Sequence, residues 1–174
     1  DGQGKKWWDD FLPHKGQKDY VETRPKGIVF DNCQRVRVEG LFLTNFPMFH
    51  MSPTMSEDVT IEGVTVYAPP KAPNTDSCNP SGWNIWVNNC NFDTGDDNIA
   101  VKPFVRGEGG RPSVENIWIT NCVFKHGHGL SVGGQTHGGL RNMVCRNITF
   151  EDTDCGPRLK AERGIDVPLH VDAA

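Results

Sequence analysis

One pattern of apolar and polar positions occurs five times along the chain. Each copy reads apolar, any residue, apolar, two further residues, apolar, any residue, apolar. Alternation with a period of two is typical of a strand that buries one face. The apolar positions are, copy by copy, Val36, Val38, Leu41 and Leu43; Val59, Ile61, Val64 and Val66; Ile85, Val87, Cys90 and Phe92; Ile117, Ile119, Cys122 and Phe124; and Met143, Cys145, Ile148 and Phe150. The first positions lie 23, 26, 32 and 26 residues apart, which indicates a structural repeat.

The step between the two apolar pairs of each copy is three residues, which is an odd number. A straight strand would therefore turn its second pair away from the core. Both pairs can face one core only if the chain bends between them. The residue just before the second pair is Gly40, Gly63, Asn89, Asn121 or Asn147. Because Gly and Asn tolerate left-handed backbone angles, each repeat is predicted to be two short strands joined at a sharp corner.

One such unit cannot close a core alone, but stacked units can. The sequence therefore predicts an all-β fold, a right-handed parallel β-helix of about five coils from roughly residue 27 to 162. Asn89, Asn121 and Asn147 would form a ladder along one corner. The alternative is a β-sandwich, but its hairpins need tight turns such as Asn-Gly, and these are scarce.

The domain organisation predicted for residues 1–174 is a single, partial β-helix domain. Residues 1–26 are expected to be the remnant of an upstream coil, and residues 165–174 an irregular tail. Residues 1–20 show no helix pattern, and neither end shows the capping that a solenoid needs.

Composition agrees with a β fold, because Val, Ile and Thr total 35 residues against 13 for Ala plus Leu. The net charge of -4 and the scattered basic residues argue against a nucleic-acid partner. No run of 18 apolar residues is present, so no transmembrane helix is predicted. The six cysteines fit no zinc spacing and are expected to be small buried thiols.

Four short polar segments follow the repeats at similar places: Asn74–Asp76, Gly95–Asp97, Gly127–Gly129 and Arg158–Lys160. If the coils stack in register, these segments lie one above the next, about 4.8 Å apart. Each segment alone is ordinary turn chemistry. Together they would place three carboxylates, an imidazole, a guanidinium and an ammonium on one wall. Neighbouring carboxylates shift one another's pKa, so one can stay protonated while others ionise, as glycoside cleavage requires.

In this order, the four segments resemble the signature segments of the polygalacturonase family, glycoside hydrolase family 28. The stretches Thr94–Lys102 and His126–Gly133 are also similar to the family, and Asp1–Gly4 looks like its upstream coil. The likeness extends to about Gly164. Three positions depart from the common pattern, namely Ser77, Asn98 and Leu159. Family members are usually more than twice as long as this chain.

The resemblance implies a role for each matching catalytic residue. Asp96 would be the general acid that protonates the glycosidic oxygen. Asp76 and Asp97 would activate the attacking water, and His128 would tune the acid and help to hold the site.

The resemblance also implies how the substrate is held. Arg158 and Lys160 would bind a galacturonate carboxylate, which suits a guanidinium and an ammonium group. Asn74 and Lys102 are further candidate substrate-binding residues. Gln135 and His126 are weaker candidates for the cleft.

The implied activity is inverting hydrolysis of α-1,4 bonds between galacturonic acid units of pectin, with no metal and no cofactor. The expected partner is a pectic polysaccharide or oligogalacturonide, with no nucleic acid and no membrane. The protein would be a monomer, secreted or periplasmic, with its signal peptide outside this chain. Alternatives are a rhamnogalacturonan hydrolase, a pectate lyase-like enzyme that uses Ca²⁺, an inactive polysaccharide-binding fragment, and a purely structural β-helix.

Overall fold

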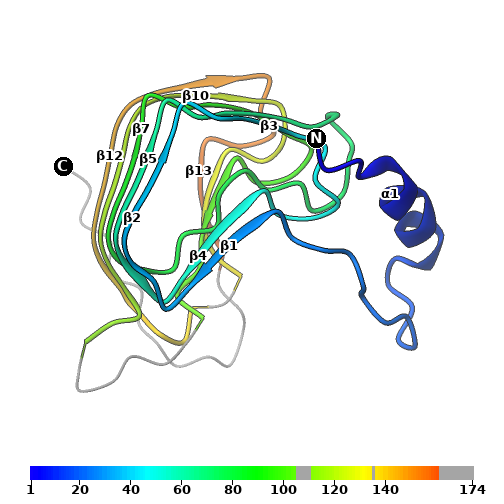
Figure 1. Cartoon of the computed structure of the whole chain (residues 1–174), viewed down its shortest axis with the longest axis horizontal. Helices are drawn as coiled ribbons and strands as arrows, with labels where there is room; N and C mark the ends of the chain where they lie inside the picture. The colour runs from blue at the N-terminus through cyan, green and yellow to red at the C-terminus, as the bar shows by residue number, and fades with distance from the viewer. Residues whose placement is uncertain (105–110, 135, 161–174) are drawn as a thin grey trace.

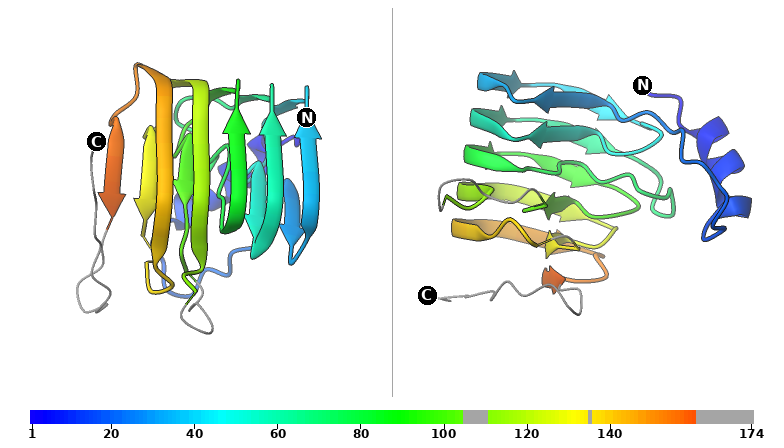
Figure 2. Two further views of the ribbon diagram at one scale, coloured as in Figure 1. Left: turned by 90° about the vertical axis from the view of Figure 1, so that its left-hand side faces the viewer. Right: turned by 90° about the horizontal axis from the view of Figure 1, so that it is seen from below.

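The computed structural model describes residues 1–104, 111–134 and 136–160. Its strands pair in parallel with strands of the next turn, so the chain winds into a solenoid of about five turns (Figures 1 and 2). The strands are β1 (Ile28–Asp31), β2 (Gln34–Glu39), β3 (Phe42–Thr44), β4 (Met51–Thr54), β5 (Ser56–Glu62), β6 (Thr65–Tyr67), β7 (Gly82–Asn88), β8 (Asn91–Asp93), β9 (Ile99–Val101), β10 (Val114–Lys125), β11 (Leu130–Gly133), β12 (Leu140–Glu151) and β13 (Pro157–Lys160).

The predicted repeats are in register. The first apolar positions of the five copies align across β2, β5, β7, β10 and β12, as Val36, Val59, Ile85, Ile117 and Met143. The last positions align in the same way, as Leu43, Val66, Phe92, Phe124 and Phe150. The β-solenoid prediction is confirmed. The sandwich alternative is wrong for the described residues, since every strand pair among them is parallel.

The corner residues have the predicted left-handed backbone. Their φ angles are 63° and 59° for Gly40 and Gly63, and 55°, 54° and 55° for Asn89, Asn121 and Asn147. The predicted asparagine ladder forms in part, because the Asn147 amide donates to Asn121 Oδ1 at 2.8 Å. The Asn121 amide then donates to Asn88 and not to Asn89, so the ladder is wrong at its third member.

A second asparagine ladder lies at the other end of the long strands and was not predicted. Asn142 donates to Asn116, and Asn116 donates to Asn84, over 3.1 and 3.0 Å. All three have φ between 53° and 59°. These bonds pair the side-chain amides at a second corner. The corner is polar, so the pattern of apolar pairs does not reveal it.

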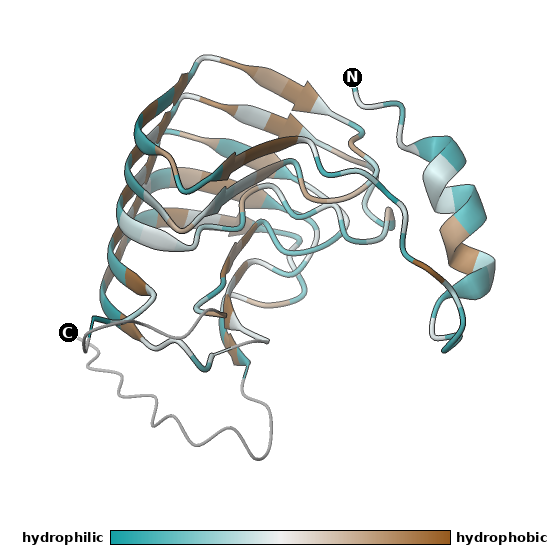
Figure 3. Cartoon of the chain, turned by 60° about the horizontal axis from the view of Figure 1, so that its bottom comes forward, coloured by the Kyte–Doolittle hydropathy of each residue, from teal (hydrophilic) through white to brown (hydrophobic). Residues whose placement is uncertain are grey.

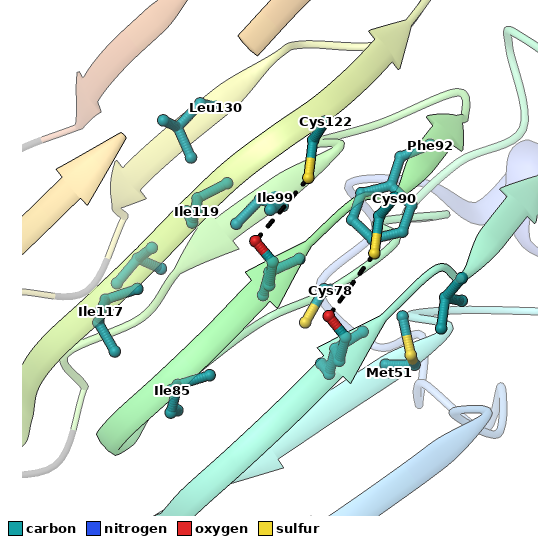
Figure 4. Close-up of a cluster of buried hydrophobic side chains, with 14 of the residues drawn as sticks. Met51, Cys78, Ile85, Cys90, Phe92, Ile99, Ile117, Ile119, Cys122 and Leu130 are labelled. Atoms are coloured by element: carbon teal, nitrogen blue, oxygen red, sulfur yellow. Dashed lines mark hydrogen bonds between the residues drawn. The ribbon is translucent and has the colours of Figure 1, made fainter. Parts of the chain in front are cut away.

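The core lies between the walls of the solenoid, where apolar side chains of successive turns stack (Figure 4). Hydrophobic residues recur along the strands of successive turns (Figure 3). Cys78, Cys90 and Cys122 are buried there as free thiols, as predicted. The Sγ atoms of Cys90 and Cys122 contact carbonyl oxygens at 3.8 and 3.9 Å. The prediction is wrong for Cys145, which is exposed because its strand, β12, is the last of its sheet. Cys33 and Cys155 are half-buried.

The N-terminal segment contains helix α1 (Lys5–Phe11) and a 3₁₀ helix (Leu12–His14), so the prediction of no helix there is wrong. Trp8 and Phe11 are buried, and the Trp8 indole donates to the carbonyl of Pro47 at 3.0 Å. A helix of seven residues is too short to display an apolar repeat, and packing stabilises it. The helix lies beside the turns (Figure 2).

Residues 1–26 contain no strand, and their assignment to an upstream coil stays a prediction. The predicted tail, residues 165–174, lies outside the described residues. Among the described residues, no helix has both the length and the apolar character to cross a membrane.

Candidate active site

One wall of the solenoid brings most of the predicted site residues together. Ile99 of β9 pairs with Leu130 of β11, and Cys78 forms a bridge with Ile99. Asp76, Asp97 and His128 each lie two positions before one of these paired residues. Three of the four polar segments therefore occupy the same place in successive turns.

The fourth segment does not align as predicted. Arg158 and Lys160 of β13 pair with Ser131 and Gly133 of β11, so the segment is aligned four positions beyond the Gly127–Gly129 segment. Their long side chains still reach Asp97, two turns away, so the expected charges meet.

Three carboxyl groups form the centre of the site. One oxygen from each of Asp76, Asp96 and Asp97 lies within 4.8 Å of the others. Asp76 and Asp97 are each 2% exposed, whereas Asp96 is half-buried. Because like charges at this distance repel in a low-dielectric environment, the cluster favours retention of a proton.

Asp97 is held as a carboxylate. Its Oδ1 accepts hydrogen bonds from Ser131 at 2.7 Å and from Arg158 at 2.5 Å, and its Oδ2 accepts one from Lys160 at 2.7 Å. Burial alone would raise the pKa of Asp97, but the bonds from Lys160 and Ser131 and the two cationic charges outweigh burial and lower it. Ser131 was not predicted, although its register with Arg158 places it between the two charged groups.

The pKa of Asp76 is shifted in the opposite direction from that of Asp97. Burial, aided by the negative charges of Asp96 and Asp97, raises the pKa of Asp76 to about 7. Lys102, a predicted substrate-binding residue, lies with its Nζ 3.7 Å from Asp76 Oδ2, and its charge lowers this pKa. Lys102 therefore lies in the site, next to a carboxyl group.

Asp96 is oriented by two backbone groups. The N–H of Asp97 donates to its Oδ1 at 2.8 Å, and the N–H of Asn74 donates to its Oδ2 at 3.2 Å. The side chain of Asn74 accepts a hydrogen bond from Arg24 at 2.8 Å. Asn74 thus contacts the predicted acid through its backbone, and its side-chain oxygen binds within the protein.

His128 requires a glycine on each side. Gly127 and Gly129 have φ of 59° and 67°, and a Cβ on either would overlap a carbonyl oxygen of the neighbouring turn. The His128 N–H donates to the carbonyl of Asp96 at 3.1 Å. Its ring Nδ1 lies 2.8 Å from Asp154, and this contact orients the imidazole.

Asp154 was not predicted, because no repeat marks it. His126 pairs with Asp93 at 2.8 Å, and Gln135 lies outside the described residues.

Three clustered carboxylates have the hard oxygen donors that divalent cations prefer. Both oxygens of Asp97, however, already accept bonds from Arg158 and Lys160. The expectation that the site uses no metal and no cofactor stays a prediction.

Asp76 and a buried neighbour, His50, act in opposite directions on the pH dependence of stability. His50 is fully buried, and its Nδ1 lies 3.1 Å from the backbone oxygen of Asp76. Burial lowers the pKa of His50 to about 4 from 6.5 and raises that of Asp76 to about 7 from 3.8. Between these values, unfolded His50 binds a proton that the folded residue lacks, so stability rises with pH. Folded Asp76 keeps a proton that the unfolded residue loses, so stability falls with pH.

The two contributions therefore cancel in large part between about pH 4 and 6.5. We expect the free energy of unfolding to fall with rising pH in His50→Gln and to rise with pH in Asp76→Asn. The unchanged protein should vary less than either variant. Urea unfolding at several pH values measures this, with His126→Gln as the control for a half-exposed histidine. Parallel pH curves for all four proteins would contradict the assignment.

Neighbouring carboxyl groups, one of them half-buried, are the groups that glycosidases use as acid and base. Comparison with family models is more specific. Residues 1–167 match the model of glycosyl hydrolases family 28, and the chain belongs to that family.

Among curated proteins, the chain is 32% identical to the endo-polygalacturonase of Pectobacterium carotovorum subsp. carotovorum over 172 residues, covering 94% of this chain and 41% of the relative. It is 31% identical to a probable polygalacturonase of Vitis vinifera over 169 residues, which covers 94% of this chain and 34% of the relative. The chain thus spans about a third to two fifths of the length of these relatives.

Solved structures with the same fold are also named as polygalacturonases. The polygalacturonase from Erwinia carotovora ssp. carotovora matches with a TM-score of 0.79 and 29% identity, over 88% of this chain and 39% of that one. An exopolygalacturonase from Thermotoga maritima matches with a TM-score of 0.71 and 29% identity, over 89% and 36%.

Proposed function

We propose that the protein hydrolyses α-1,4 bonds between galacturonic acid units of pectin. The observation that carries the proposal is the cluster of three carboxyl groups, Asp76, Asp96 and Asp97, in which Arg158 and Lys160 bind Asp97 and burial raises the pKa of Asp76. This arrangement supplies an acid and a base within one cluster, as glycoside cleavage requires. The relatives named as polygalacturonases support the substrate.

In the proposed reaction, Asp96 gives its proton to the glycosidic oxygen as the bond to the anomeric carbon breaks. Water attacks the anomeric carbon and releases its proton to Asp76, while Asp97 accepts a hydrogen bond from the same water. Burial raises the pKa of Asp76 to about 7, so Asp76 can take up the proton that the water releases, and the proposed roles require Asp96 to begin the reaction with its proton. Asp96 suits this role because it is the most exposed of the three.

Arg158 and Lys160 are proposed to bind a galacturonate carboxylate. Both are about 30% exposed, and each keeps donors beyond those that Asp97 uses. Lys102 and Asn74 are proposed as further substrate-binding residues. The Asn74 side chain faces Arg24, so its contribution to binding would come through the backbone. His128, oriented by Asp154, is proposed to tune the acid.

Inversion of configuration is proposed from the family resemblance. The carboxyl oxygens lie within 4.8 Å, closer than the separation of about 6.5–9.5 Å that is usual for inverting enzymes, so this distance does not support it. NMR of the first anomer released tests the proposal directly. We also propose that the protein is a monomer and is secreted or periplasmic.

Product analysis distinguishes this function from its alternatives. Reducing ends should appear when the chain is incubated with polygalacturonate and not with rhamnogalacturonan. The reverse preference would indicate a rhamnogalacturonan hydrolase. Unsaturated products that disappear with a chelator would indicate a Ca²⁺-dependent lyase, and substrate binding without any product would indicate a polysaccharide-binding fragment.

A further inference from the structure

A buried arginine outside the predicted site connects the N-terminal segment to the catalytic wall. The side chain of Arg24 is 1% exposed, although a buried guanidinium is costly unless its donors are satisfied. Here all three nitrogens donate. Nε and Nη2 bind Glu22 at 3.0 and 2.6 Å, Nη1 binds the carbonyl of Pro73 at 3.2 Å and approaches that of Pro47, and Nη2 binds Asn74 Oδ1 at 2.8 Å.

The guanidinium of Arg24 also packs against an aromatic ring. Its Cζ lies 3.6 Å from the ring centroid of Phe11 in helix α1. The Pro47 carbonyl that it approaches accepts the indole N–H of Trp8 from the same helix. Arg24 therefore joins α1, the loop after β3 and the segment before Asp76.

Asn74 transmits this contact to the reacting groups. It adopts φ of 56°, an uncommon backbone conformation, and Arg24 holds its side-chain oxygen. In that conformation its N–H donates to Asp96 Oδ2. Two residues further, Asp76 belongs to the same carboxyl cluster.

We infer that Arg24 is a positioning residue: through Asn74 it fixes the orientation of the Asp96 carboxyl group and the place of Asp76. This inference rests on the proposed function for its catalytic consequence. It makes the N-terminal segment part of the active-site scaffold, although the segment carries no group that touches the substrate.

Arg24→Lys tests the inference, because Lys keeps the charge but cannot reach Glu22, Pro73 and Asn74 together. We expect kcat on polygalacturonate to fall by about tenfold to a hundredfold, as small misplacements of reacting groups do. KM should change by less than about threefold, because Arg158 and Lys160 are untouched. Arg37→Lys is the matched control, since Arg37 also pairs with a Glu two residues away but is 60% exposed.

A second variant separates positioning from general stability. Asn74→Gly removes the side-chain oxygen and still permits a positive φ. If Arg24 acts through Asn74, the Arg24→Lys and Asn74→Gly double variant should lose no more kcat than Asn74→Gly alone. Additive losses, or a kcat of Arg24→Lys within about twofold of the unchanged chain, would overturn the inference.

Amide hydrogen exchange keeps the test independent of activity. Arg24→Lys should speed exchange at the amides of residues 74–76 and leave the β10 and β12 amides protected, whereas Arg37→Lys should change neither. If the unchanged chain releases no product from polygalacturonate, the proposed function fails, and exchange decides the positioning role alone. Unchanged exchange in residues 74–76 would then overturn it.

Discussion

Asp96→Asn should lower the rate of polygalacturonate hydrolysis by about 10²–10⁴-fold, the range that general acid–base catalysis contributes. An amide cannot give a proton to the glycosidic oxygen. Asn is nearly isosteric with Asp, but it has a single acceptor oxygen, so it can keep only one of the two hydrogen bonds that the Asp97 and Asn74 N–H groups donate to Asp96. Because Asp96 is half-buried and lies outside the apolar core, the fold should persist, and the main loss should lie in kcat. Initial rates of reducing-end release measure it.

Asp58→Asn is the matched control for this experiment. Asp58 is exposed, has a φ of 56°, and accepts a bond from Asn84 that an amide oxygen can also accept. Its variant should hydrolyse at the rate of the unchanged protein. Asp96→Asn at near-full rate would remove Asp96 from the role of acid, and Asp76, whose pKa burial raises to about 7, would replace it.

The fold was predictable because its determinants are local and repeated. Alternating apolar residues specify a buried strand face, and a Gly or Asn specifies each corner. Stacking then follows, since no single turn can bury its own face. Helix α1 escaped prediction because its stability comes from burial of Trp8, which bonds a distant loop at Pro47, and of Phe11, which packs against Arg24, and the local sequence does not display these contacts.

The site was predictable as a set of residues and less so as a geometry. Asp76, Asp97 and His128 lie at one place because each precedes its strand by the same interval. Arg158 and Lys160 lie within β13 and not before it, so the predicted alignment with the other three segments is wrong. Only the length of their side chains brings them to Asp97.

The residues that support the site could not be found from motifs. Arg24 lies 50 residues from its partner Asn74, and Ser131 acts by standing between Asp97 and Arg158. Arg24 stands in no recognisable pattern. Ser131 lies in a stretch that resembles the family, but its role depends on contacts between turns, which the sequence does not display. Family resemblance identifies the groups that react, whereas the structure identifies the groups that hold them.

Phe124→Ala should cause the largest loss of stability, about 3–5 kcal/mol, because it leaves a cavity in the core. Phe124 is fully buried; its ring lies parallel to that of Phe92 at 5.9 Å and edge-on to that of Phe150 at 5.6 Å. In a solenoid each turn contacts only its neighbours, so removing a central ring weakens two interfaces at once. This loss is a large part of the stability of an ordinary domain.

Urea unfolding of three variants tests whether this stack supports the solenoid. Phe42 lies in the first turn, where its strand position pairs with Thr65 of the next turn, and it is 65% exposed. Phe42→Ala should therefore change the free energy of unfolding by no more than about 0.5 kcal/mol. Phe150→Ala should fall between the two, because Phe150 is half-buried in the last strand of its sheet. Equal losses for Phe124 and Phe42 would show that burial in the stack does not determine stability. The graded order would show that each ring contributes according to the number of turns packed against it.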